Sequence, residues 1–279
     1  MIRTRRVALA MLARGAAAGL LPGIAAGRAD EIINTLYQSR TVITGQDPER
    51  RGPGLIACFK LVLAKVSGDR RLLDDPAADL GADQIQPLIA GLTLHDQKAG
   101  RPVHDEQGTR DRPYDLTVTF KPDAIDAILR KLGHRPWTGP RPTVLAVVAV
   151  KRGGAAFVLS RDGGRGPGMD EALANAAERF GLRVLLPSQA DLRAAAVTSG
   201  TKDHATPAAL RRLTHRAGAD VALTGLLRWS DAALGWVVDW RLTNAGKPAT
   251  WSAQGLNFDE AFRIGVGVAA RILSGNGLP

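Results

Sequence analysis

Residues His134–Val150 read HRPWTGPRPTVLAVVAV, and this stretch divides the chain into two parts. Its first nine residues contain three prolines and one glycine, so they cannot continue a helix, and they predict a short, stiff linker over 136–142. The run TVLAVVAV (143–150) predicts a strand, and because apolar residues occupy both of its faces, helices should cover both sides of its sheet. We therefore expect an amino-terminal unit over 30–135 and a carboxy-terminal unit over 143–275.

The carboxy-terminal unit is expected to be a mixed sheet with packed helices, because helical and strand patterns follow one another along it. Short loops between its last three strands favour an antiparallel meander. The predicted elements after 143–150 are a helix from Met169 to Phe180, a strand at 183–187, a helix from Pro207 to Gly218 capped by Thr206, strands at 220–229, 235–243 and 248–255, and a helix that begins at Asn257.

The amino-terminal unit is expected to be a smaller α+β unit. The segment YDLTVTF (114–120) alternates apolar and polar residues, which predicts a half-buried strand. The other predicted elements are a strand at 35–44, a helix from near Pro53 to Gly68, a shorter helix carrying Ile85, Leu88, Ile89 and Leu92, a possible strand at 92–96, and a helix at 122–133. The predicted fold class is thus α+β and α/β, in two small mixed domains.

Residues 1–29 have the layout of an export signal. Arginines at positions 3, 5 and 6 precede an Ala/Leu-rich stretch, and small residues near Ala26–Ala29 offer a cleavage site. This segment holds five arginines and no acid, so its removal would lower the formal net charge from +10 to +5. Such a modest excess, without a Lys/Arg run, does not predict nucleic-acid binding and leans toward anionic polymers of the cell envelope. We expect a periplasmic protein that does not span the membrane after signal removal.

The stretch HDEQGTRDRPYDL (104–116) concentrates polar side chains in a loop of about seventeen residues between two predicted strands, and loops of that length are often functional. The favoured interpretation is a structural loop in which Arg110 and Arg112 bond Asp105, Asp111 or Asp115. A second is a recognition loop made by His104, Asp105, Glu106, Gln107, Arg110, Asp111 and Arg112. A third is a metal site that adds His95 and Asp96 to His104, Asp105 and Glu106, although no metal-binding spacing is present.

Four tryptophans, Trp229, Trp236, Trp240 and Trp251, fall in the predicted meander. Trp236 and Trp240 share one face of an alternating strand, which favours sheet core, with an exposed binding face as the alternative. The single cysteine, Cys58, excludes an intrachain disulfide and a Cys-rich zinc site, and its apolar surroundings favour a buried residue.

Two further motifs remain incomplete. SGTK (199–202) fits the Ser-x-x-Lys pattern of penicillin-recognising enzymes, but their Lys-Thr-Gly motif is absent. GGRGPGMDEAL (163–173) could cradle a phosphate, yet Met169 replaces the third glycine of the dinucleotide fingerprint. The sequence therefore predicts no catalytic residue, no cofactor and no metal ligand set.

Three segments carry a resemblance to a known family: LAKVSGD (63–69), HDEQGTRDRPYDLTVTF (104–120) and LGHRPWTGPRP (132–142). Together they resemble an uncharacterised proteobacterial envelope family, the domain of unknown function twenty-sixty-six, and this resemblance implies no activity. The order of elements over 143–273 is also similar to small α/β domains of the curli secretion-channel lipoproteins, of the Tol-Pal propeller protein and of lipoprotein activators of penicillin-binding proteins. Such domains bind partners rather than catalyse reactions.

These observations favour an exported, non-catalytic binding or assembly factor for an unidentified envelope protein or glycan. The alternative is a metal-dependent or hydrolytic enzyme that uses the His/Asp/Glu cluster at 95–106.

Overall fold

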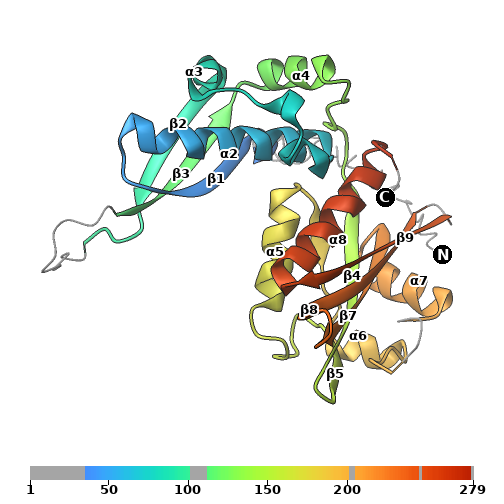
Figure 1. Cartoon of the computed structure of the whole chain (residues 1–279). Coiled ribbons are helices and arrows are strands. Elements are labelled where there is room, and N and C mark those ends of the chain that lie inside the picture. Colours follow the sequence, from blue (N-terminus) through green and yellow to red (C-terminus); the bar gives the residue numbers. More distant parts are fainter. Residues whose placement is uncertain (1–34, 101–111, 201–204, 245–246, 278–279) are drawn as a thin grey trace, which may run out of the picture.

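The computed structural model describes residues 35–100, 112–200, 205–244 and 247–277, and its strands form two separate sheets (Figure 1). Sheet A is antiparallel, with the order β1-β3-β2, and sheet B is mixed, with β5-β4-β7-β8-β9 and β6 paired to β4. The strands are β1 (Gln38–Thr44), β2 (Ile89–Asp96), β3 (Pro113–Phe120), β4 (Thr143–Arg152), β5 (Ala155–Val158), β6 (Arg183–Leu185), β7 (Val221–Ser230), β8 (Gly235–Asn244) and β9 (Lys247–Leu256). The predicted mixed α and β fold class is confirmed.

The helices pack on these two sheets. The α-helices are α2 (Pro48–Ser67), α3 (Ala82–Ile85), α4 (Pro122–Lys131), α5 (Met169–Arg179), α6 (Gln189–Ala194), α7 (Pro207–Arg216) and α8 (Phe258–Leu273), and the short 3-10 turns are η1 (Arg70–Leu73), η2 (Pro76–Ala78) and η3 (Gln86–Leu88). Within the described ranges, none of these helices is both long and apolar enough to cross a membrane. We call the part built on sheet A (35–133) the A unit, and the part built on sheet B (143–277) the B unit.

In the A unit, the long helix α2 packs on one face of sheet A (Figure 1). The alternation predicted for 114–120 is confirmed, because Leu116, Val118 and Phe120 are fully buried against this helix. The rings of Phe59 on α2 and Phe120 on β3 meet edge to face, with 6.0 Å between centroids. Aromatic pairs favour this arrangement, so it fixes how the helix crosses the sheet.

In the B unit, β4 is covered on both faces, as its apolar run predicts. Val144, Ala146 and Val148 pack in the cluster that includes residues of α5 and α8. Leu145 and Val147 point to the other face, where they pack with residues of α6 and α7. The predicted meander is also confirmed, since β7, β8 and β9 pair antiparallel in sequence order.

The stretch 85–92 differs from its prediction. We expected one helix carrying Ile85, Leu88, Ile89 and Leu92, but α3 ends at Ile85 and β2 begins at Ile89. The proline at position 87 has no amide hydrogen to continue an α-helix, so only one 3-10 turn, η3, separates the two elements. The possible strand at 92–96 is therefore the end of a longer strand.

Three other elements depart from the sequence prediction. The helix expected to open near Pro53 begins one turn earlier, at Pro48, so Pro53 lies inside α2. The strand β5 forms a hairpin with β4 across Gly153 and Gly154, both at positive φ, where glycine is favoured. Helix α6 begins behind Ser188, whose side chain accepts a hydrogen bond from the Asp191 amide. Both β5 and α6 are short, and sequence periodicity is weak over so few residues.

Candidate functional site

The predicted recognition loop is described only at its end. His104, Asp105, Glu106, Gln107, Arg110 and Asp111 lie outside the described residues. Arg112 Nη1 lies 2.8 Å from Asp96 Oδ2, and this bond holds the pKa of Asp96 below its ordinary value. Asp115 accepts a hydrogen bond of 2.9 Å from Gln97 Nε2. Both described carboxylates at this end of sheet A are thus partnered, although this bond of Arg112 goes to Asp96, which was not among its expected partners Asp105, Asp111 and Asp115.

The alternative metal site is also described only in part. His95 is exposed on β2, next to the Arg112-bonded Asp96, and the other three expected ligands lie outside the described residues. Within the described ranges, no group of three or more His, Cys, Asp or Glu side chains is placed to hold a metal ion. Of the expected metal site, the structure describes His95 and Asp96. Among the described residues, no third side chain joins them to form a metal-binding group.

The four tryptophans are divided between core and surface. Trp236 and Trp240 are 4% and 1% exposed and belong to the apolar cluster of the B unit, so their ring faces are not on the surface. Trp229 is 36% exposed, stacks under the Arg152 guanidinium at 4.7 Å, and donates to Asp231 through Nε1. Trp251 is half-buried. The structure thus brings these residues into one meander but not onto one open face.

The other singled-out residues also have structural surroundings. Cys58 is buried, and burial raises the pKa of its thiol. Gly168, in the glycine-rich stretch, caps α5 at a φ of 77°. The lysine of SGTK lies outside the described residues.

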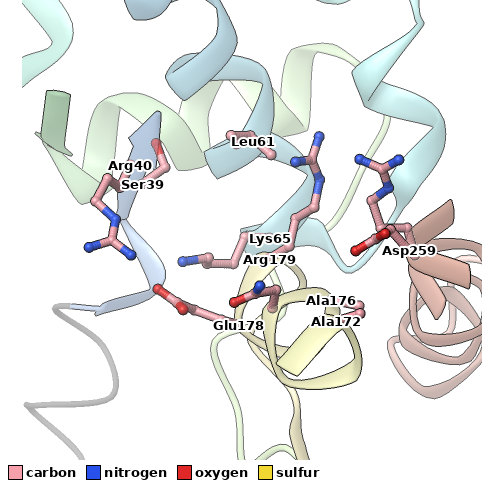
Figure 2. A pocket seen from close by; sticks show the side chains of 11 residues that line it. Ser39, Arg40, Leu61, Lys65, Ala172, Ala176, Glu178, Arg179 and Asp259 are labelled. Carbon is pink, nitrogen blue, oxygen red and sulfur yellow. The ribbon is translucent and has the colours of Figure 1, made fainter. Parts of the chain in front are cut away.

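A charged cleft lies where the A unit meets the B unit (Figure 2). It has a volume of about 290 Å³, and β1 and α2 form one wall while α5 and α8 form the other. The lining residues are Ser39, Arg40, Leu61, Lys65, Ala172, Asn175, Ala176, Glu178, Arg179, Asp259 and Arg263. Four of these side chains are cationic and two are anionic, so the lining carries an excess of two positive charges.

Lys65 is the most deeply placed of these cations. It stands in the last turn of α2, is 8% exposed, and donates from Nζ to the main-chain carbonyls of Gln38 at 2.9 Å and Thr35 at 3.4 Å. Burial lowers its pKa, and the negative charge of Glu178 partly opposes that shift. No carboxylate of the described residues lies within 4.0 Å of Lys65 Nζ. Among the described residues, the ammonium is thus buried without an ion-pair partner, a costly arrangement.

The opposite wall concentrates guanidinium groups from α5 and α8. Glu260 pairs with Arg263 at 2.6 Å and with Arg70 at 3.6 Å, so one carboxylate serves two arginines. Arg179 has no ion pair within the described part of the chain, and its buried Nε lacks a hydrogen-bond partner, as do those of Arg70 and Arg263. Burial, followed by repulsion from Arg263, lowers the pKa of Arg179. On this wall, Arg179 is therefore a partly buried cation without a counter-ion among the described residues.

The two walls are joined by the segment around Trp137 and Arg141. Arg141 donates to the carbonyls of Lys65 on α2 and Phe180 after α5, each at 2.8 Å, and its guanidinium stacks on Trp137 at 4.2 Å. The Trp137 amide donates to the Val66 carbonyl at 2.7 Å. Two of the segments behind the family resemblance, 63–69 and 132–142, thus pack together and hold the cleft walls in position.

A buried ionic contact lies close to the same joint in the sequence. The Asp69 carboxylate is fully buried, accepts from Arg71 Nη2 at 2.6 Å, and lies 3.7 Å from His134 Nδ1. From the other end of the chain, Asn276 Nδ2 donates to the Ser67 carbonyl at 2.7 Å. Ala64 of α2 belongs to the apolar cluster of the B unit, so the two units share packed surface.

The arrangement suits binding better than nucleophilic catalysis. Ser39 is the hydroxyl residue that lines the cleft, and its hydroxyl donates to the Cys58 carbonyl at 2.8 Å. Because both printed hydrogen bonds of Lys65 Nζ also go to carbonyls, the lysine is not placed as a base for that serine. Charged groups on two facing walls can instead hold a polar ligand.

Sequence analysis did not single out the cleft residues. They come from four elements, of which β1 and α2 lie in residues 38–67 and α5 and α8 lie in residues 169–273. One local signal was present, since Lys65 interrupts the apolar run LVLAKV (61–66). A charged residue at such a position is rarely buried without a functional or ionic partner.

Comparison with known proteins gives one match. Residues 31–138 match the model of a family described as "Domain of unknown function (DUF8605)". The match covers the A unit and ends at Thr138, so it includes the segments 63–69 and 104–120 and the start of 132–142. No curated protein and no solved structure matches the chain. A domain of unknown function is thus shown for the amino-terminal part of the chain.

Proposed function

We propose that this is an exported, non-catalytic binding protein of the bacterial envelope, and that its ligand lies in the cleft between the A and B units. The cleft carries this proposal, because side chains from both units line one space, and Arg141 bonds main-chain carbonyls at the ends of α2 and α5, one from each wall. A volume of about 290 Å³ is at the lower end of the range for small-ligand sites, about 300–1,000 Å³. It suits a short segment of a glycan better than the broad face of a protein.

Three expectations from the sequence belong to this proposal. The layout of residues 1–29 supports export to the periplasm. The similarity of the three segments to the proteobacterial family twenty-sixty-six supports an envelope role, and that finer assignment remains part of the proposal. The net charge of +5 after signal removal supports attraction to anionic envelope polymers.

The proposal is tested by capture of envelope material with two matched variants. Asn175 lines the cleft on an exposed position of α5, so Asn175→Trp should block the cleft without disturbing either core. Ala174 is exposed on the same helix and does not line the cleft, so Ala174→Trp is the control. Purified proteins are incubated with soluble periplasm and with released envelope glycans, and bound material is identified by mass spectrometry. We expect glycan captured by the wild type and by Ala174→Trp, and not by Asn175→Trp.

Equal capture by both tryptophan variants would show that the cleft is not the ligand site. If the wild type captures a protein in place of a glycan, and Asn175→Trp does not, the cleft remains the binding site. The partner is then a protein and not the proposed glycan. The enzymatic alternative is tested separately by elemental analysis of the purified protein. A stoichiometric divalent metal that disappears in His95→Ala/His104→Ala would overturn a non-catalytic role.

A further inference from the structure

The charged side chains that line the cleft fall into two groups. We call Arg40, Lys65 and Glu178 the Lys65 group, because Figure 2 shows Glu178 toward Lys65 and Arg40, and the charge of Glu178 acts on Lys65. We call Arg179, Arg263 and Asp259 the Arg179 group, because Arg263 acts on Arg179 and lies one helical turn from Asp259 on α8. Figure 2 shows Asp259 on the side of the cleft away from Arg40.

Each group has one positive charge in excess. The Lys65 group combines two cations with one carboxylate, and so does the Arg179 group. The ion pair of Arg263 with Glu260 does not cancel the second excess, because Glu260 is shared with Arg70. With Arg70, Glu260 and Asp74, which also act on Arg179, the neighbourhood contains three arginines and three carboxylates, so the excess of one positive charge belongs to the side chains that line the cleft. Two separate positions in one cleft are thus prepared for negative charge.

Two small, uncharged side chains also line the cleft, and Figure 2 shows them on the side of Asp259. Ala172 and Ala176 line the cleft four residues apart on α5, so their methyl groups lie on the same face of the helix. These methyl groups leave room for a ligand but offer it no charged contact. Its ends would then be recognised by the two charged groups.

We infer that the cleft binds a ligand with two separated anionic groups, carboxylate or phosphate, one held by the Lys65 group and one by the Arg179 group. This inference rests on the proposed function and specifies the chemistry of its ligand. A bound anion would give Lys65 Nζ and the Arg179 guanidinium the counter-ion that each lacks within the described residues. Guanidinium groups suit this role because they bind carboxylate and phosphate in bidentate geometry.

The first test measures which anions bind to the purified protein. Linear dicarboxylates of increasing chain length, monocarboxylates of matched length, inorganic phosphate and pyrophosphate are titrated by calorimetry at low ionic strength. We expect one dianion length to bind about 10-fold or more tightly than the matched monoanion, with affinity falling as salt rises. Preference for pyrophosphate over every dicarboxylate would assign a phosphate ligand, and the reverse a carboxylate ligand. Equal binding of monoanions and dianions, or no binding of either, would overturn the inference.

The second test uses substitutions with opposite expected signs. Glu178→Gln and Asp259→Asn change exposed side chains and should each tighten dianion binding about 2- to 5-fold, because each removes a competing carboxylate. Lys65→Met and Arg179→Met should each weaken it about 5- to 10-fold. Arg211→Gln removes an exposed positive charge on α7, outside the lining, and should change affinity less than about 2-fold.

The outcomes separate this inference from the proposed function. If Glu178→Gln weakens binding or leaves it unchanged, the ligand is cationic or neutral. The inference of a ligand with two anionic groups is then wrong. Glycan capture that Asn175→Trp abolishes would then still support the proposed function. If Asn175→Trp leaves dianion binding intact, the anions bind outside the cleft. The cleft is then wrong as the ligand site in the inference and in the proposed function.

Discussion

Arg141 donates a hydrogen bond of 2.8 Å to the main-chain carbonyl of Lys65, the residue whose ammonium lines the cleft. The same guanidinium also bonds the carbonyls of Val66, Trp137, Phe180 and Gly181, so one side chain joins α2, the linker and the end of α5. Burial lowers the pKa of Arg141 to about 10, still well above neutral pH. The joint between the units is thus a charged side chain bound to neutral carbonyls.

Arg141→Leu should destabilise the protein by about 2–4 kcal/mol, because several buried carbonyls lose a charged donor at once. Arg141→Lys should recover little of this loss, since an ammonium cannot reproduce the planar fork of donors. Urea denaturation followed by fluorescence measures both. Arg135→Gln, at an exposed position nearby, is the control. Full stability of Arg141→Lys would show that charge alone, without geometry, joins the units.

Asp69 should make the protein sensitive to acid. The bonds from Arg71 outweigh burial and hold the pKa of Asp69 below its ordinary value in the folded state. Its contribution is therefore present above the unfolded pKa, about 3.9, and is lost as the pH falls through the lower folded value. Asp69→Asn should cost about 3 kcal/mol at pH 7.

That cost should shrink as urea unfolding is repeated at successively lower pH below about 4. Asp83→Asn, at an exposed position of α3, should show no such convergence with the wild type. A stability difference for Asp69→Asn that is independent of pH would contradict the assigned role.

Lys65 should affect the stability of the protein in the alkaline pH range, in contrast to Asp69. Burial lowers its pKa in the folded state, so between the folded and unfolded values the unfolded chain binds the extra proton. Stability therefore rises with pH in that window, which ends near the unfolded pKa of about 10.4. We expect the free energy of unfolding of the wild type to increase relative to that of Lys65→Met as the pH is raised toward this value. A relative decrease would mean that an ion pair stabilises the ammonium.

The fit of Trp240 depends on two glycines. A Cβ added at Gly265 on α8 or at Gly225 on β7 would lie 2.5 Å from the Trp240 ring. Gly265→Ala should therefore cost about 2–3 kcal/mol through overpacking, and combining it with Trp240→Phe should recover part of that cost. A thermodynamic cycle of the two substitutions measures the coupling. Gly91→Ala, where the nearest atom would be 3.9 Å from the added Cβ, is the control. Strictly additive effects of Gly265→Ala and Trp240→Phe would contradict the overpacking explanation.

Patterns within single elements were enough to predict most of the secondary structure. The alternation in 114–120, the apolar run at 143–150 and the helix signals around Thr206 and Asn257 all match the observed elements. In each, neighbouring residues determine which face is buried. The prediction failed at 85–92, where residues at helical spacing are divided among the end of α3, the turn η3 and the strand β2, and it missed the short elements β5 and α6. Pairing with β3 decides the state of that segment, and pairing is not visible in one strand alone.

The charges of the polar stretch 104–116 are adjacent in sequence, so a sequence pattern can indicate them as a candidate site. The cleft, in contrast, is lined by Arg40, Lys65, Arg179 and Arg263 from elements far apart in the chain. Adjacent charges are visible to sequence analysis, but their partners are not, as the bond from Arg112 to Asp96 illustrates. The cleft forms where long-range contacts bring the two units together, as in the bonds of Arg141 to the carbonyls of Lys65 on α2 and of Phe180 after α5. Local periodicity thus specifies the helices and strands, and long-range contacts between them create the charged site.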